Sequence, residues 1–208
     1  MDILDQLGVA LGLASLAGVN LYLTVFLVGL SVRFNWIDLF SQYEQFAVLG
    51  SPVILGVAGG LFLVEFFADK VPWVDSAWDS VHTLVRPIGG TMLAMAALGE
   101  LDQEFTVIAG LLSGGASLIT HATKASTRLV LNMSPEPVSN MFASVAEDGL
   151  VVGGLGLVAF LPGIAFFAFI IVLIGCVFFI YKLSGALRRV VMKIRGRRND
   201  VAVELTEA

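Results

Sequence analysis

The chain has 208 residues, of which 57% are hydrophobic and 14% charged, and its mean hydropathy is +0.90. This composition excludes an ordinary soluble domain, which needs far more charge to cover its surface. The net charge of −5 gives no reason to expect a nucleic-acid partner, and the single cysteine, Cys176, excludes an intrachain disulfide and a cysteine-based metal cluster.

Six apolar runs follow one another along the chain, each close to the ~20 residues that a helix needs to cross a bilayer. Such runs are too long for membrane strands, and in lipid only helices and closed barrels satisfy their backbone groups. They therefore predict an all-α integral membrane protein with about six transmembrane helices. The predicted spans are 8–31, 47–67, 83–99, 105–124, 143–161 and 163–183, with a tight turn at Pro162-Gly163.

The third predicted span is short, and Arg86 near its start must lie at an interface or in a polar cavity. Residues 73–81, just before it, combine two tryptophans with an apolar stripe, which favours an interfacial amphipathic helix with an aromatic belt. Asp75, Asp79 and His82 share helical spacing and could also form a catalytic or metal-binding face. We favour the interfacial interpretation.

Lysine and arginine residues indicate the orientation of the spans. Seven of them lie between Lys182 and Arg198, which divides the chain into a transmembrane helical domain, 1–185, and a basic cytoplasmic tail, 186–208. With an even number of spans both termini face the cytoplasm, and we expect a bacterial inner (cell) membrane. The tail serves either as a topology signal or as a surface that lies on the anionic inner leaflet.

Two stretches of the chain match each other. Gly60 and Lys70 are ten residues apart, as are Gly114 and Lys124, and the glycine pairs that follow also keep their spacing. The match predicts an internal hairpin repeat in which spans 2 and 3 correspond to spans 4 and 5, with the same direction across the bilayer.

Polar residues line one face of the fourth span. At about 100° per residue, its serines, Thr120, His121 and Lys124 share one arc, and such a face avoids lipid. Asn20 lies in the middle of the first span, and acidic pairs lie in the second and fifth. The candidate pathway or solute-binding residues are Asn20, Thr24, Glu65, Asp69, Lys70, Ser113, Ser117, Thr120, His121, Lys124, Glu147 and Asp148.

The acids among these residues can pair with nearby bases at the cytoplasmic ends of the spans; the bases are Lys70, Arg86, Lys124 and Arg128. A buried ammonium without a partner would be neutralised or would cost several kcal/mol. We therefore expect Lys124 within ~4 Å of a carboxylate, either Glu147 or Asp148.

Each candidate also has a purely structural interpretation. Serine and threonine hydroxyls on membrane helices often bond the carbonyl one turn back. Lysines near helix ends can extend to the interface. His121 can be a packing histidine, and Asn20 can hold two helices together.

Motifs typical of common enzymes are missing from the sequence. Neither GxxxxGK[ST], HExxH nor CxxC occurs, and His82 and His121 are 39 residues apart. We expect no enzyme, no cofactor and no metal site.

The stretches EFFADKVPWVDSAWDSVHTLVRPIGG and NMSPEPVSNMFASVAEDG resemble a family of small bacterial multi-pass proteins classified as domain of unknown function 4126, over about residues 5–180. The resemblance implies an integral membrane protein and supplies no activity. A second likeness is to cation/proton exchangers that carry E-x-G-D-K-[ST] in each half. Here Glu65 to Asp69 is one residue longer, Val71 replaces the hydroxyl, and residues 119–124 hold no acid, which argues against a divalent-cation site.

The leading functional hypothesis is a small transporter or channel with a polar, helix-lined pathway for an ion or small polar solute. Its carboxylates could carry protons or cations, or its bases could bind an anionic solute. The alternative is a non-transporting membrane scaffold or assembly factor that docks through its basic tail. The expected partners are the lipid bilayer and an ion or small solute, with homo-oligomer formation left open.

Overall fold

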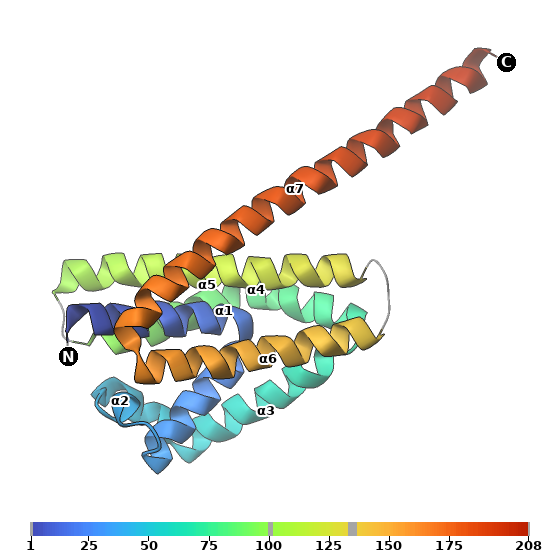
Figure 1. The fold of residues 1–208 in the computed structure, drawn as a ribbon. Coiled ribbons are helices and arrows are strands. Elements are labelled where there is room, and N and C mark those ends of the chain that lie inside the picture. Colours follow the sequence, from blue (N-terminus) through green and yellow to red (C-terminus); the bar gives the residue numbers. More distant parts are fainter. Residues whose placement is uncertain (1, 100–101, 133–136, 208) are drawn as a thin grey trace.

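The structure is a computed structural model that describes residues 2–99, 102–132 and 137–207. Within these ranges all regular elements are helical, and most lie in one bundle (Figure 1). In chain order they are α1 (Ile3–Phe34), α2 (Asp38–Ser41), the 3-10 helix η1 (Glu44–Gly50), α3 (Pro52–Ala68), α4 (Pro72–Leu98), α5 (Gln103–Asn132), α6 (Pro137–Phe160) and α7 (Pro162–Glu207).

The prediction of an all-α protein with about six membrane helices is confirmed. Five described helices are long and apolar enough to cross a membrane, and a sixth is reached when η1 and α3, which meet at 67°, are counted together. The boundaries differ from the prediction. The interfacial stretch 73–81 and the third span form one continuous helix, α4, which also runs through Pro87. The tight turn between the last two spans is confirmed, but it lies at Leu161, and the predicted turn residues Pro162 and Gly163 begin α7.

Helix α1 is broken in its middle, whereas the sequence predicted a continuous span. Asn20 has an extended backbone, with φ −147° and ψ 98°. Both ends of α1 lie toward the same end of the bundle, since α2, which follows α1, lies near the N-terminus (Figure 1). Burial and the nearby Asp5 carboxyl also raise the pKa of Tyr43, which follows α2. Gly163 also lies against Asp5. Helix α1 therefore enters the bundle, turns at Asn20 and returns, with its second half beside α3 (Figure 1).

The two ends of the bundle can be defined by their residues. The N-side holds Asp5, Tyr43, the α4–α5 junction near Gly99, and Gly163. The C-side holds the turn 69–71 and the α5–α6 connection, where Asn140 donates to Asn132. Helices α3 to α6 each run between the two sides, and α7 leaves the N-side at Pro162. The N-terminus and the C-terminal end of α7 therefore lie at opposite ends of the structure (Figure 1).

The first half of α1 forms the centre of the bundle. Its apolar residues Val9, Leu13 and Ala14 are fully buried, and glycines at positions 8, 12 and 18 bring its backbone close to α5, α6 and α7. Helix α7, in contrast, exposes most of its phenylalanines and isoleucines, which suits a lipid-facing helix. The side chains of the predicted basic tail from Lys193 onward lie outside the described set.

The predicted repeat equates α3–α4 with α5–α6. The two lysines that anchor the match lie in different surroundings: Lys124 is buried inside the bundle, whereas Lys70 donates to the carbonyl of Phe66 at 2.6 Å and lies over its ring. The repeat stays a prediction.

Candidate functional site

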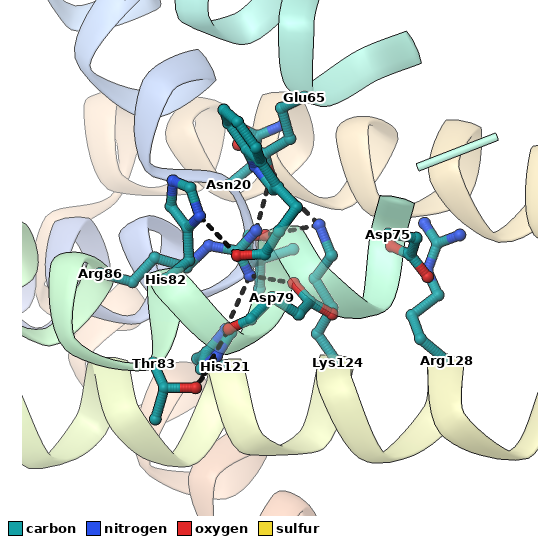
Figure 2. A network of polar contacts seen from close by, with 12 residues as sticks. Asn20, Glu65, Asp75, Asp79, His82, Thr83, Arg86, His121, Lys124 and Arg128 are labelled. Carbon is teal, nitrogen blue, oxygen red and sulfur yellow. Dashed lines mark hydrogen bonds and ion pairs between the residues drawn. The ribbon is translucent and has the colours of Figure 1, made fainter. Parts of the chain in front are cut away.

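Charged side chains from four helices meet inside the bundle, next to the break in α1 (Figure 2). We call them the charged cluster. It consists of the residues joined by seven ion-pair contacts: the bases Arg86, Lys124 and Arg128 and the acids Glu65, Asp69, Asp79 and Glu147. Glu65 and Arg86 are fully buried, and no base is more than 5% exposed.

Lys124 of α5 lies at the centre of the charged cluster. Its Nζ atom is 3.2 Å from Glu65 on α3 and 3.3 Å from Asp69, which caps the C-terminal end of α3. It is also 3.4 Å from Glu147 on α6, so the predicted contact with Glu147 is confirmed. The alternative, Asp148, accepts a hydrogen bond from Asn20 instead. The sequence did not indicate that α3 would supply the two closer partners.

Arg86 of α4 joins the cluster to α1 and α5. Its Nη2 donates to Glu65 at 2.7 Å, and its Nη1 donates to His121 Nδ1 at 2.7 Å and to the carbonyl of Gly18 at 3.4 Å. Because arginine only donates, His121 must accept on Nδ1 and carry its hydrogen on Nε2. That hydrogen points to the hydroxyl of Thr83, 3.2 Å away. His121 is therefore held neutral.

Arg128 connects the charged cluster with backbone groups on the C-side. It binds both carboxylate oxygens of Glu147, at 3.1 and 2.7 Å, in a forked geometry that suits a guanidinium. It also contacts the Asp69 carboxylate at 3.3 Å and donates to the backbone carbonyls of Asp69 and Asn140. The side chain thus neutralises the C-terminal end of α3, where a cation is favourable.

Asn20 produces the break in α1. Its side-chain oxygen accepts from the backbone N–H of Leu23 at 2.9 Å, so it acts as the N-cap of the second half of the helix, a position that asparagine favours. Its amide nitrogen donates to Asp148 on α6 at 3.0 Å. The hydroxyl of Thr24 donates to the carbonyl of Asn20 at 2.7 Å. One asparagine therefore both starts a helix and holds it against α6.

Charged or polar side chains bind backbone carbonyls in the last turns of the first half of α1, where a helix end leaves carbonyls without helical partners. Gly18 accepts from Arg86, Val19 accepts from Lys124 at 3.3 Å, and Ser15 accepts from Thr120 at 2.8 Å. Two cations thus lie at the negative end of a half-helix, which is the favourable end for them.

The second half of α1 contacts α4 through aromatic and imidazole groups. The Tyr22 hydroxyl is 2.9 Å from His82 Nε2, while His82 Nδ1 lies 2.7 Å from the carbonyl of Trp78. Since that carbonyl accepts, Nδ1 carries a hydrogen and Nε2 can accept from Tyr22. The Trp78 ring stacks on the imidazole, with ring centres 4.5 Å apart.

The structure brings most of the predicted site residues together, some in the charged cluster and others around it. Asn20, Glu65, Asp69, His121, Lys124, Glu147 and Asp148 lie in or against the charged cluster, while Thr24, Ser117 and Thr120 bond to backbone carbonyls around it. Ser113 is buried, but it lines a cavity with apolar residues of α1 and α7. Lys70 lies outside the cluster, because it follows the end of α3 and turns back to Phe66.

Five residues of the site were not in the predicted set: Asp75, Asp79, His82, Arg86 and Arg128. The four on α4 lie at positions i, i+4, i+7 and i+11, which share one helical face. That periodicity is a signal for them, but the tryptophans beside it favour a helix at the membrane surface. Asp75 is fully buried and accepts from Asn132 at 3.4 Å.

The charges in the cluster do not balance. Four carboxylates face three bases, and the geometry around His121 keeps it neutral. Burial of ions is expensive, and it is offset only by close pairing and hydrogen bonds. The arrangement can therefore bind a proton or a cation, which would supply the missing positive charge.

Comparison with known proteins gives a family but no activity. The family model described as Domain of unknown function (DUF4126) matches residues 7–182. Searches of curated proteins and of solved structures gave no match. Because the family model covers nearly all of the helical bundle, the chain belongs to the DUF4126 family.

Proposed function

We propose that the protein is a membrane carrier for an ion or small polar solute, with α1 as its moving element. The observation that carries the proposal is the break of α1 at Asn20, next to a buried charged cluster. Carriers often place their binding sites at broken helices, because half-helix ends and free carbonyls can bind charged groups near the bilayer midplane. Ionisable residues inside a membrane are rare, and they often mark solute or proton pathways.

The shared ion pairs also support a moving structure. Lys124 contacts acids on both α3 and α6, and Arg86 contacts α1, α3 and α5. A cation with several partners can exchange one for another when helices shift. Two arrangements of the bundle can then be close in free energy, which is what a switching transition requires. The excess of carboxylates favours a cation or a proton over an anionic solute.

The test is flux through liposomes that contain the purified full-length protein. A panel of monovalent cations, amines and small polar solutes is supplied under an imposed pH gradient or membrane potential, and transport currents are recorded. We expect one class to give currents that a Lys124→Met variant lacks. Currents equal to those of empty liposomes across the whole panel would argue against a carrier.

A membrane scaffold is the second candidate. Helix α7 continues past the apolar part of the chain to Glu207, and Arg188 and Arg189 are exposed on it, which would suit a docking element. Removal of residues 186–208 separates the two functions. A carrier keeps its flux without the tail, whereas a scaffold loses its bound partners.

The proposed topology places the N-terminus outside the cell membrane and the C-side in the cytoplasm. Lys70 and the basic stretch after Lys182 follow the C-side, whereas acids such as Asp5, Asp38 and Glu104 lie on the N-side. Basic residues favour the cytoplasm. Since α1 returns to the N-side, five crossings remain, and the sequence-based expectation of two cytoplasmic termini no longer follows.

Reporter fusions at the two ends of the chain check this topology. We expect a periplasmic-type signal at Met1 and a cytoplasmic signal at Ala208. Cytoplasmic signals at both ends would mean that α1 crosses the whole bilayer and that the break at Asn20 is only a kink.

A further inference from the structure

A polar cavity lies between α4 and α5 beside the charged cluster. Its volume is about 210 Å³, and it is lined by Ser76, Asp79, Ser80, Thr83, Ala125 and Leu129. The hydroxyl residues at positions 76, 80 and 83 follow one face of α4, and all three are exposed. They begin one turn from the C-side end of the helix. Asp79, which is only 5% exposed, forms the inner wall.

Asp79 is the acid in the cluster with the weakest interactions. Neither of its carboxylate oxygens has a hydrogen-bond partner within the described part of the chain. Arg86 Nη1 is 3.3 Å away, but the two hydrogens on that nitrogen are directed to His121 and to the carbonyl of Gly18. Glu65, in contrast, accepts from both Arg86 and Lys124.

The charge excess of the cluster is therefore concentrated on Asp79. The ionisable groups around it are Asp69 at the C-terminal end of α3, Asp75, His82 and Arg86 on α4, His121 and Lys124 on α5, and Glu147 on α6. The three bases are already engaged by the other carboxylates. A buried carboxylate without donors is far less stable than a carboxylic acid at the same place.

We propose that Asp79 takes up and releases a proton through the α4–α5 cavity, and so serves as the coupling site of the carrier; this rests on the proposed function. A proton from water on the C-side binds the carboxylate to give the acid, and release returns the same proton, so that charge and atoms balance. Protonation brings the cluster to equal numbers of positive and negative charges. Within the described residues no group of three or more histidine, cysteine or acidic side chains could hold a metal ion, and a proton needs no such shell.

Infrared titration of the full-length protein in liposomes tests the site without a known solute. On acidification from about pH 9 to about pH 6, where exposed carboxylates stay ionised, the carboxylic acid C=O band should grow, and Asp79→Asn should reduce that growth by one group per protein. Asp102→Asn, an exposed acid on the N-side, is the matched control and should leave the titration unchanged. Ser80→Phe should fill the cavity and slow the shift of the band in D2O.

The outcomes separate this site from the carrier function. A titration that Asp79→Asn leaves unchanged overturns the proton site, even when liposomes show flux. A C=O band that changes with Na⁺ at fixed pH also overturns the proton site, because a metal cation then binds where the proton was proposed to bind. Growth of the band that is reduced by one group in Asp79→Asn, with the melting temperature kept, supports the site even if no solute in the panel is transported.

Discussion

Arg86→Met is expected to lower the free energy of unfolding by about 3–5 kcal/mol, the range for breaking a buried ion pair from one side. The guanidinium is fully buried, and its loss leaves His121 and the carbonyl of Gly18 without this donor and leaves Glu65 with Lys124 alone. Methionine fills a similar volume, so the loss reports on charge and hydrogen bonds rather than on a cavity. Denaturant unfolding in detergent measures the change.

The matched control is Arg188→Met, which removes an exposed arginine from α7 beyond the bundle. Its effect should stay within about 0.5 kcal/mol. Arg86→Lys should rescue only partly, because an ammonium cannot reproduce the fork that binds an acid and an imidazole together. Equal, small effects for Arg86→Met and Arg188→Met would contradict the buried ion pair.

Lys124→Met should have an effect of the same size, about 3–5 kcal/mol, since three acids lose the cation they share. Adding a second substitution at one of the acids shows which acid loses most stability when Lys124 is removed. Adding Glu147→Gln should recover little. In the Lys124→Met variant Glu147 still has its fork with Arg128, and the second substitution breaks that fork while Glu65 and Asp69 each keep only one arginine. Adding Glu65→Gln or Asp69→Asn should recover more, with coupling energies of about 0.5–3 kcal/mol.

Thermal or denaturant unfolding of the single and double variants gives these coupling energies. Full recovery with Glu147→Gln alone would show that the single contact predicted from the sequence dominates. The three-partner arrangement would then be wrong.

The polar face of α5 could be predicted because a helix places residues three and four apart on one side. Ser117, Thr120, His121 and Lys124 all proved to be buried. Asp79 and Arg86 follow the same rule on α4, but the tryptophans and the apolar stripe beside them suggested a separate interfacial helix. Periodicity within one helix fixes a face, and it does not reveal which other helix the face meets.

The break in α1 has no comparable local signal. Asn20 stands between apolar residues that would continue a helix in lipid, and its extended backbone is held by tertiary contacts: Asp148 binds its amide, and Arg86 and Lys124 bind the carbonyls of Gly18 and Val19. The direction of Lys70 was unpredictable for a similar reason, because a residue just after a helix end has no fixed face.

Access to the break from both sides of the membrane tests the carrier most directly, and it needs no known solute. Thr24→Cys, in a Cys176→Ser background, places a thiol next to Asn20 at a residue that is fully buried. A membrane-impermeant thiol reagent is applied to either side of liposomes, with Gln42→Cys and Val138→Cys as controls for the N-side and the C-side. A moving α1 predicts slow labelling of Thr24→Cys from both sides. A thiol that stays unreactive from both sides, yet reacts fully after unfolding, would contradict a carrier and leave a static bundle.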